Sequence, residues 1–406
     1  MRSEGWIPTT LGAEADLLTG FPFKSSMYSD FPGDVKLLRG DNIVQGSLRW
    51  DGVKRWPRGL ANDFARYQLQ PGDVVLAMDR PWIEAGLKFA ALAEGDLPAL
   101  LVQRVARLRG NEELDTRFLR YLIGSASFTH HILAVQTGTA VPHISGEQIR
   151  SFQFLRPPLS KQKAIAEILG SLDDKIDLNR RMNETLEAIA RAIFKSWFLE
   201  FSTGRRSQGW RHGRLGEVAD NPRRGVDPTE VPPSTPYIGL EHMPRKCIAL
   251  DQWGSSEDLA SGKFSFSRGE ILFGKLRPYF HKVGVAPVEG VCSTDILVVV
   301  PKRDIYFGLL LGHVSSEEFV AYTDRSSAGT KMPRTNWADM ARYEITIPPD
   351  TVALEYTALV QPMVDKIMTN VHESRTLTVL RDTLLPKLLS GEIRVKQAER
   401  LVGEAV

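Results

Sequence analysis

The sequence contains little of what marks an exported, membrane-spanning or metal-bearing protein. Its 406 residues include only two cysteines, Cys247 and Cys292, which argues against a disulfide framework and a cysteine-rich zinc site. No apolar run approaches the roughly 18 residues that a membrane span needs. The start of the chain, residues 1–6, is not followed by the apolar core of a signal peptide. We therefore expect a cytoplasmic protein without a membrane partner.

The charge balance excludes little, because the formal net charge is only +2. Overall charge neither demands nor forbids nucleic acid, since a basic binding face can be local. Hydrophobic residues make up 42 % of the chain, which is ordinary for packed cores, and 406 residues predict two or three domains. The function must therefore be inferred from the organisation of the chain.

The second half of the chain repeats the first at a slowly decreasing offset. The matching segments, with their offsets, are Leu11–Asp16 and Leu215–Asp220 (204), Lys36–Gly40 and Pro236–Leu240 (200), Gln70–Leu76 and Ser267–Phe273 (197), Gly138–Pro142 and Gly329–Pro333 (191), and Asp174–Ile176 and Asp365–Ile367 (191). The order never changes, as expected of a duplication with a few loop deletions. The interval is too long for a solenoid. We interpret it as a duplicated domain pair, the alternative being two unrelated domains with coincidental turns.

Each repeat begins with about 150 residues of short apolar runs separated by glycine and proline. Asp73–Met78 and Ile296–Val300 have the pattern of buried strands, and Arg117–Ile123 that of a short helix. The scattered turn residues suit irregular loops on a small core. We therefore predict an α/β (α+β) globular domain in each repeat.

Each repeat ends in a long predicted helix. Pro157 and Pro158 end the preceding segment, Ser160 can cap the helix, and apolar residues then recur at spacings of three and four up to about Phe198. This seam predicts that the two helices pair as an antiparallel coiled coil with pseudo-twofold symmetry. The positions predicted to pair are Leu169, Leu172, Ile176, Asn179 and Leu186 in the first helix, and Val360, Met363, Ile367, Asn370 and Leu377 in the second.

Two polar residues and two prolines interrupt this pattern. Asn179 and Asn370 occupy the same repeat position, where a buried asparagine lowers stability but sets register; alternatively, Asn179 turns outward at a bend. Pro362 and Pro386 predict a second helix that is shorter or bent.

The helix length has a consequence for the spacing of the two globular parts. A helix of about 38 residues is about 57 Å long, longer than the roughly 34 Å of one DNA turn. If the helices pair antiparallel, the globular parts lie at opposite ends of a rod. Such a protein would contact two DNA half-sites around an unread gap, and the half-sites would differ because the two globular sequences differ.

With these features in place, the chain resembles the specificity subunit of type I restriction–modification systems. The resemblance lies in the segments Arg156–Ala166, Leu172–Asn179, Phe194–Phe198 and Leu384–Ile393, and in the paired Gly138-Thr139 and Gly329-Thr330 turns. It implies two target recognition domains that bind double-stranded DNA. It also implies helices that dock two modification (adenine methyltransferase) subunits, with restriction subunits as further partners. Pro348–Val352 departs from the family pattern, which bears on the symmetry of docking.

The repeat and the resemblance together suggest the following division of the chain. Residues 1–156 are the first target recognition domain and 157–200 the central helical spacer. Residues 201–347 are the second recognition domain, 348–392 the C-terminal helical spacer and 393–406 a tail.

Enzyme motifs are incomplete in this sequence. Gly269–Leu276 nearly forms a phosphate-binding loop but lacks its Ser/Thr hydroxyl, and the Pro-Pro pairs lack the flanking amide and aromatic of adenine methyltransferases. His130-His131 has no second ligand cluster. We therefore expect a non-catalytic subunit without metal or cofactor. Two alternatives remain: a helical-rod scaffold that binds only proteins, and a nuclease or methyltransferase with degenerate motifs.

Candidate DNA contacts are basic, amide, hydroxyl and aromatic side chains in loops, because phosphates and base edges are bound by such groups. We predict Lys24, Ser25, Arg39, Arg80, Gln136, Thr139 and His143 in the first repeat, and Arg223, Arg224, Lys275, Arg277, Tyr279, Arg325, Thr330, Lys331 and Arg334 in the second. For any one of these residues, the alternative is an ordinary solvated surface side chain.

Overall fold

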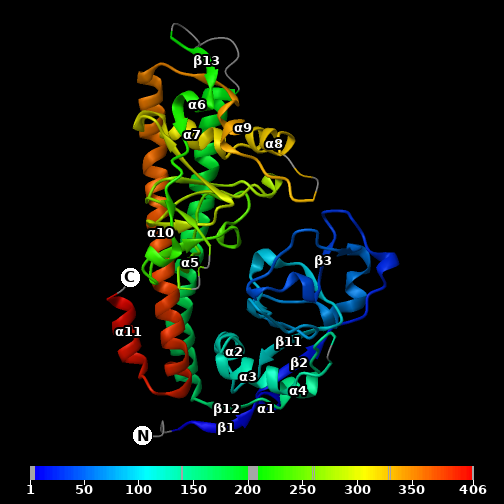
Figure 1. Cartoon of the computed structure of the whole chain (residues 1–406). Coiled ribbons are helices and arrows are strands. Elements are labelled where there is room, and N and C mark those ends of the chain that lie inside the picture. The colour runs from blue at the N-terminus through cyan, green and yellow to red at the C-terminus, as the bar shows by residue number, and fades with distance from the viewer. Residues whose placement is uncertain are drawn as a thin grey trace. The chain divides into compact units, whose positions relative to one another are not determined.

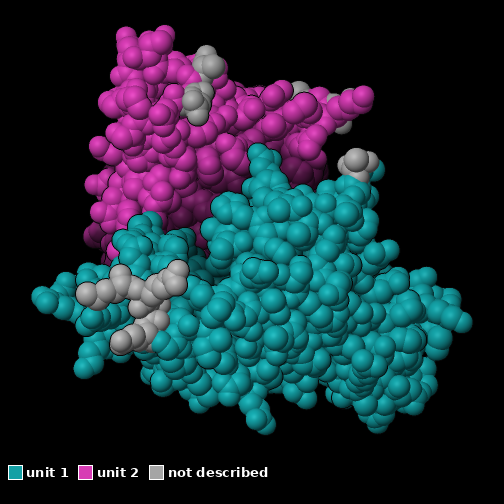
Figure 2. Space-filling view, turned by 90° about the horizontal axis from the view of Figure 1, so that it is seen from below, with its two compact units in different colours: residues 1–173, 379–406 teal, residues 174–378 magenta. Residues whose placement is uncertain are grey.

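The computed structural model describes residues 5–138, 140–199, 209–257, 259, 261–327, 329 and 331–404. It divides into two compact units, which we call unit 1 (residues 1–173 and 379–406) and unit 2 (residues 174–378) (Figure 2). No helix within the described ranges is both long and apolar enough to span a bilayer.

Unit 1 is built on a five-stranded sheet of order β2-β11-β6-β9-β4 and a three-stranded sheet of order β10-β3-β5. Its strands are β1 (Ile7–Thr10), β2 (Ala15–Thr19), β3 (Val35–Leu38), β4 (Gln45–Gly46), β5 (Arg55–Trp56), β6 (Val74–Ala77), β7 (Trp82–Ile83), β8 (Gly86–Leu87), β9 (Phe89–Ala91), β10 (Ala99–Leu101), β11 (Val105–Gly110) and β12 (Gln153–Arg156). Its shorter helices are α1 (Leu11–Glu14), α2 (Thr116–Ile123), α3 (Ala126–Val135), α4 (Gly146–Arg150) and α11 (Val395–Gly403).

Unit 2 contains a four-stranded sheet of order β14-β22-β19-β20 and a five-stranded sheet of order β15-β18-β21-β16-β17. Its strands are β13 (Arg211–Arg214), β14 (Ala219–Asp220), β15 (Gly225–Val226), β16 (Pro236–Ile238), β17 (Gly254–Ser255), β18 (Lys263–Phe266), β19 (Ile271–Gly274), β20 (Val283–Val285), β21 (Gly290–Cys292), β22 (Ile296–Pro301) and β23 (Glu344–Ile347). Its shorter helices are α6 (Leu215–Val218), α7 (Phe307–Val314), α8 (Glu317–Arg325) and α9 (Trp337–Ala341).

The two units share one topology, which confirms the internal repeat. The run β2-β11-β6-β9 of unit 1 corresponds to β14-β22-β19-β20 of unit 2. The second sheet of each unit also contains one parallel pair of strands. In unit 1 it is β3 with β10, where Leu37 lies opposite Leu100, and in unit 2 it is β16 with β21, where Ile238 lies opposite Cys292. The predicted buried strands are β6 and β22, and the predicted short helix is α2.

Two long helices, α5 (Leu159–Phe194) and α10 (Asp350–Ser390), end the two repeats, as predicted. They pair antiparallel within each unit. In unit 2 the Asn179 amide donates a 3.3 Å hydrogen bond to the hydroxyl of Ser374, and in unit 1 Arg381 donates a 2.8 Å bond to Asp173. Figure 1 shows α5 in green beside α10 in orange within unit 2.

The asparagines of the seam lie inside the pair. Asn179 is 1 % exposed and Asn370 is fully buried. Eight other residues were predicted to pair. Five of them are buried, namely Leu169, Leu172, Val360, Ile367 and Leu377, and three are half-buried, namely Ile176, Leu186 and Met363. The outward orientation considered for Asn179 is therefore absent from the structure.

The expectation that Pro362 and Pro386 shorten the second helix is wrong. Helix α10 has 41 residues, against 36 in α5, and continues through both prolines. A proline removes one backbone hydrogen bond and crowds the preceding turn. Both prolines lie on the exposed face, while Val360, Val364 and Leu384 bury the opposite face. Packing of that face therefore outweighs the local cost.

Candidate nucleic-acid interface

Each unit presents an arginine in a left-handed backbone conformation in the loop after a central strand. Arg80 follows β6 with a φ of 44°, and Arg277 follows β19 with a φ of 51°. They are 197 residues apart, the offset at which β6 and β19 themselves match. Each is followed by a proline, which restricts the next φ as well. The two repeats therefore hold an arginine in the same unusual geometry.

A second loop holds each arginine in place. The backbone N–H of Arg80 donates to the carbonyl of Pro142 (2.6 Å), and that of Arg277 donates to the carbonyl of Pro333 (2.8 Å). The loop begins at a glycine in both units, with a φ of +92° at Gly138 and +101° at Gly329. These φ values favour glycine because a Cβ is strained there. The matched glycine turns thus form one side of the same site as the matched arginines.

Backbone strain in the described residues is concentrated on basic side chains. The non-glycine residues with positive φ are Arg80, Arg104, Lys246, Arg277 and His281. Such a conformation costs about 1–3 kcal/mol and persists at sites where the surrounding structure imposes it, commonly functional ones. In unit 2, the N–H of Lys246 donates to the carbonyl of His281 (2.8 Å), which joins two of them. This distribution marks these loops as the candidate interface.

In unit 1 the site is a polar hollow with a basic lining. Its residues are Tyr28, Arg39, Gly40, Asp41, Asp79, Arg80, Lys88, Val102, Gln103, Arg104 and Val141. Burial lowers the pKa of Lys88, because removing the ammonium from water penalises its charged form. The carboxylates are engaged locally, Asp79 with Arg104 (3.7 Å) and Asp41 with Arg39 (3.4 Å). Four basic groups against two carboxylates leave the hollow suited to an anion.

In unit 2 the corresponding loops are also basic. Arg277 has a buried Nε with no hydrogen-bond partner among the described residues, and its guanidinium lies 5.9 Å from the ring centre of Phe280. Arg334 pairs with Asp295 at 3.2 Å, and the carbonyl of Asp295 accepts a hydrogen bond from the backbone N–H of Lys275. Burial lowers the pKa of Lys282, the repeat equivalent of Lys88. Both units therefore hold a desolvated lysine at the matching repeat position, and in unit 2 its ammonium donates to the carbonyl of Leu240.

The structure brings together only part of the predicted DNA-contacting set. Arg39 and Arg80 line one hollow, and a β-bridge joins Asp79 to His143 beside it. In unit 2 a β-bridge joins Leu276 to the predicted Arg334. Leu276 stands in the sequence between the predicted Lys275 and Arg277, so the bridge brings these three basic residues into adjacent loops. Helix α8, which ends at the exposed Arg325, contacts the short helix Pro278–Phe280 that carries Tyr279.

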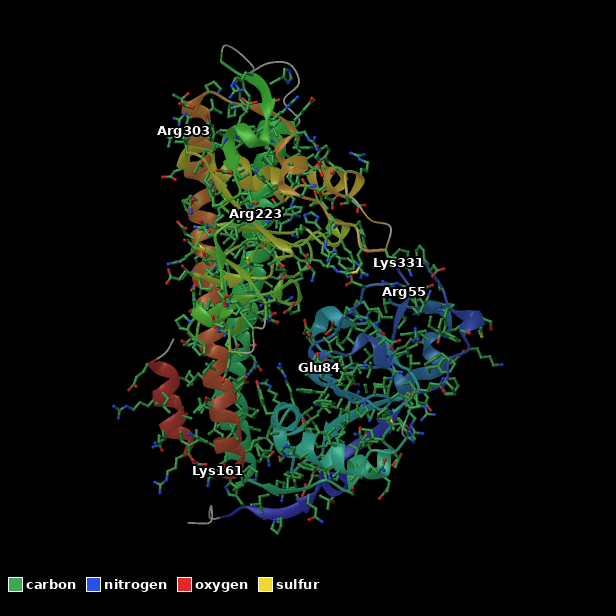
Figure 3. The ribbon with its side chains drawn as sticks, in the orientation of Figure 1. Arg55, Glu84, Lys161, Arg223, Arg303 and Lys331 are labelled. Carbon is green, nitrogen blue, oxygen red and sulfur yellow. The ribbon has the colours of Figure 1, made fainter. Side chains whose placement is uncertain are left out.

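Other predicted contacts lie elsewhere or have other partners. Lys24 and Ser25 are exposed but do not line the hollow, and Gln136 ends α3 half-buried. Arg224 forms an ion pair with the half-buried Glu270, and Arg223 lies over the ring of Phe264 at 5.7 Å. Lys331 is exposed, and Figure 3 shows it well away from the long helices of unit 2. Thr139 and Thr330 lie outside the described residues.

Lys88, Lys282, Arg104 and Trp82 are not among the residues predicted from the sequence. Comparison of the repeats at offsets of 194 and 197 pairs Lys88 with Lys282 and Trp82 with Tyr279. That comparison was available from the sequence alone. The left-handed conformation of Arg104 was not, because nothing in its residue type predicts a φ of 66°.

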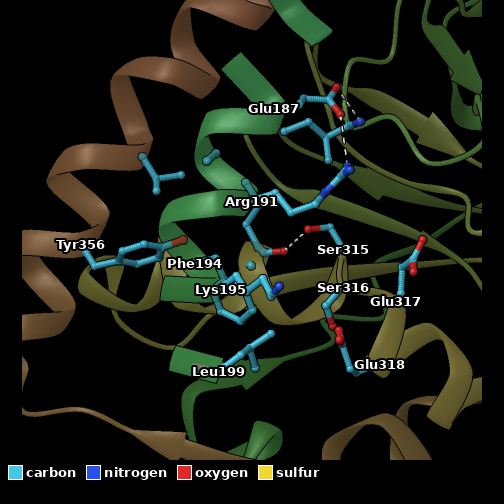
Figure 4. Close-up of a pocket in the computed structure, with 15 residues that line it drawn as sticks. Glu187, Arg191, Phe194, Lys195, Leu199, Ser315, Ser316, Glu317, Glu318 and Tyr356 are labelled. Carbon is cyan, nitrogen blue, oxygen red and sulfur yellow. Dashed lines mark hydrogen bonds and ion pairs between the residues drawn. The ribbon is translucent and has the colours of Figure 1, made fainter. Parts of the chain in front are cut away.

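Unit 2 contains a different hollow, whose residues connect α5 to the sheet region. Its lining combines apolar side chains, among them Phe194 and Tyr356, with charged ones such as Glu187 (Figure 4). At its edge Glu187 accepts hydrogen bonds from the backbone N–H groups of Ile248 (2.9 Å) and Ala249 (3.2 Å). Burial raises the pKa of Glu187, while the hydrogen bonds from Cys247, Ile248 and Ala249 lower it. Glu187 thus ties α5 to the sheet region of unit 2.

The described residues contain no group of three or more His, Cys, Asp or Glu side chains arranged to hold a metal ion. His131, one of the paired histidines considered for metal, has its Nε2 2.8 Å from the carbonyl of Gln148. Gly269–Leu276 contributes the strand β19 rather than a phosphate-binding turn.

Comparisons with known proteins point to one family. The family model for the type I restriction modification DNA specificity domain matches residues 19–188. The type I restriction enzyme MjaIX specificity subunit of Methanocaldococcus jannaschii is 25 % identical over 391 residues, which cover 89 % of this chain and 84 % of that protein. The MjaVIII specificity subunit of the same organism is 34 % identical over 192 residues, 47 % of this chain and 44 % of that one.

A solved structure supports the fold. The type I restriction-modification S subunit from M. genitalium matches with a TM-score of 0.56 at 15 % identity, over 95 % of this chain and 96 % of that chain. That structure supports the fold, and the sequence matches show that the chain is similar to the specificity subunits of type I restriction enzymes.

Proposed function

We propose that the chain recognises a bipartite, asymmetric DNA target, one half-site through each repeat. The observation that carries this proposal is the duplication of the strained arginine loop, with Arg80 clasped by Pro142 and Arg277 clasped by Pro333. Duplicated loops suit two half-sites. The surrounding side chains differ between the copies, with His143 in one where the other has Arg334, so the half-sites differ in sequence.

The domain division follows from the same proposal. Residues 1–156 and 201–347 act as the target recognition domains, and residues 157–200 and 348–392 as the helical spacers. The DNA contacts are the basic groups of the two loop sites, and Lys24, Ser25, Gln136, Thr139, Thr330 and Lys331 remain further candidates. We also propose a cytoplasmic location, because the DNA and the partner subunits are there.

The long helices are the proposed docking surface for two adenine methyltransferase subunits, with restriction subunits joining the same complex. Large apolar side chains are exposed along α5 and α10 in unit 2: Leu178 is 47 % exposed, Leu354 55 % and Leu359 46 %. Apolar groups left on the outer face of a packed helix pair favour a protein partner. The relatives named above are themselves called specificity subunits of restriction enzymes.

The test is a map of methylated adenines in cells that produce a cognate methyltransferase with and without this chain. A new motif of two short, unlike halves around a fixed gap is the expected result. A chain carrying Arg277→Ala and Arg334→Ala should degrade only one half of that motif, and Arg80→Ala only the other. If no new motif appears while the methyltransferase methylates DNA with another specificity subunit, the proposal is wrong and a scaffold without DNA binding is favoured.

A further inference from the structure

Each arginine loop exposes an aromatic side chain two residues beyond the arginine. Trp82 is 39 % exposed and Tyr279 is 50 % exposed. They lie 197 residues apart, in Arg80-Pro81-Trp82 and Arg277-Pro278-Tyr279. Single exposed apolar residues are common on proteins. The recurrence of an exposed aromatic residue at one position of two diverged repeats is the feature that calls for an explanation.

An aliphatic side chain is exposed at the matching place of each glycine loop. Val141 is 44 % exposed and Met332 is 46 % exposed, and the offset between them is 191. Each immediately precedes the proline whose carbonyl accepts the hydrogen bond from the arginine N–H. An aromatic and an aliphatic side chain therefore flank the two ends of one hydrogen bond in both units.

The backbone around these side chains is restrained. Arg80 and Arg277 hold left-handed φ values, and the following prolines limit the next φ. In unit 1, Trp82 also pairs with Leu87 in the β7–β8 hairpin. In unit 2, the ring of Phe280 lies 4.7 Å from that of Tyr279 and 4.0 Å from the guanidinium of Arg245. Restrained exposed side chains lose little conformational entropy when they bind.

The charges beside these side chains favour a polyanion over a protein surface. Arg80, Lys88 and Arg104 lie in the hollow that Val141 also lines. In unit 2, Lys275, Arg277 and Arg334 belong to the corresponding loops, which the Leu276–Arg334 bridge joins. Apolar side chains within a basic rim are what proteins use when they open a DNA base step, because phosphates bind the rim while the apolar group meets the base faces.

We propose that Trp82 with Val141, and Tyr279 with Met332, are paired wedges, each of which contacts an unstacked base step in its own half-site. The inference rests on the proposed function and adds residues that select the target by its deformability. Opening a step costs free energy, and stacking of the base on an aromatic ring offsets that cost. Steps that unstack easily, such as pyrimidine–purine steps, are then favoured at these positions.

The test measures DNA affinity of the complex of this chain with its methyltransferase, on the target defined by methylation mapping. The probes are the intact duplex and two duplexes with a mismatch that opens a step, one in each half-site. Trp82→Ala should weaken binding to the intact duplex about 10- to 100-fold. The loss should shrink to below about threefold when the mismatch lies in the first half-site, and persist when it lies in the second. Tyr279→Ala should show the mirrored pattern.

Controls separate a wedge from other roles. Trp82→Phe should retain most of the affinity, and the salt dependence of binding should be the same in Trp82→Ala as in the parent, because no phosphate contact is lost. An equal loss on intact and mismatched duplexes, a flatter salt dependence, or no loss would overturn the wedge while leaving specific binding intact. Loss of the methyltransferase with unchanged DNA affinity would identify a protein contact instead. If the parent complex does not distinguish target from scrambled DNA, the proposed function itself fails.

Discussion

The side-chain amide of Asn370 donates a 2.8 Å hydrogen bond to the side-chain oxygen of Asn183, deep between α5 and α10. The mirrored contact runs from the amide of Asn179 to the hydroxyl of Ser374 at 3.3 Å. Asn370 and Ser374 follow Asn179 and Asn183 by the same 191 residues. The helix pair in unit 2 therefore has a polar centre with local twofold pseudosymmetry. Buried polar contacts of this kind select one register among several that an apolar seam would allow.

This polar centre should respond differently to single and double substitution. Asn370→Leu leaves Asn183 buried without its donor and should lower the free energy of unfolding by about 1–3 kcal/mol. The double change Asn183→Leu with Asn370→Leu removes both polar partners and should restore or exceed the parent stability. Urea unfolding followed by circular dichroism measures both. A double variant less stable than either single variant would show that the asparagines stabilise the pair rather than select its register.

His313 should make unit 2 sensitive to acid. It is buried in α7, neither ring nitrogen has a hydrogen-bond partner among the described residues, and burial lowers its pKa to about 3. The unfolded chain protonates this side chain below about pH 6.5 whereas the folded chain does not. Stability is thus fully present above pH 6.5 and falls as the pH drops toward 3, by at most about 1.4 kcal/mol per pH unit.

The change His313→Leu should remove this acid sensitivity. The equivalent position in unit 1 is Leu122, buried in α2, so leucine suits the site. The stability difference between variant and parent, from urea unfolding at pH 7.5, 6 and 5, should grow as the pH falls. His212→Leu, at an exposed histidine, is the matched control and should show a constant difference. A constant difference for His313→Leu as well would contradict the assignment.

Lys331 should contribute a phosphate contact. It is exposed in the loop that follows Gly329. Lys331→Ala should weaken binding to all DNA sequences similarly and reduce the slope of log affinity against log salt concentration by about 0.9. Lys396→Ala, an exposed lysine on α11, should leave the slope unchanged. An unaltered slope in Lys331→Ala, measured by fluorescence anisotropy between about 50 and 200 mM salt, would remove Lys331 from the interface.

The exposed leucines of α10 should carry methyltransferase docking. The double change Leu354→Glu and Leu359→Glu places charge on an apolar outer face and should abolish co-purification of the methyltransferase. Unfolding of the isolated chain should change little, because both side chains are already about half exposed to water. Leu354→Met with Leu359→Met keeps the apolar surface and should retain the partner. Normal complex formation by the glutamate variant would place docking elsewhere.

Local signals in the chain were sufficient for the repeat, the long helices and the asparagine seam. Collinear matches survive loop deletions, and a spacing of three and four residues is a property of neighbouring positions. The extent of α10 was not available in this way. Pro362 and Pro386 predict a break by local rules, and only the burial of Val360, Val364 and Leu384 against their surroundings maintains the helix.

The candidate site likewise has features that the sequence predicts and features that only tertiary contacts determine. Sequence alone determined that Arg80 and Arg277 occupy matching positions of the two repeats, because residue type and order are written in the chain. Only the tertiary structure decided that Arg80 and Pro142 meet, that Arg104 adopts a left-handed backbone and that Arg224 is occupied by Glu270. These features depend on contacts between segments more than 40 residues apart or on strain imposed by surrounding packing, and neither leaves a signature in neighbouring residues.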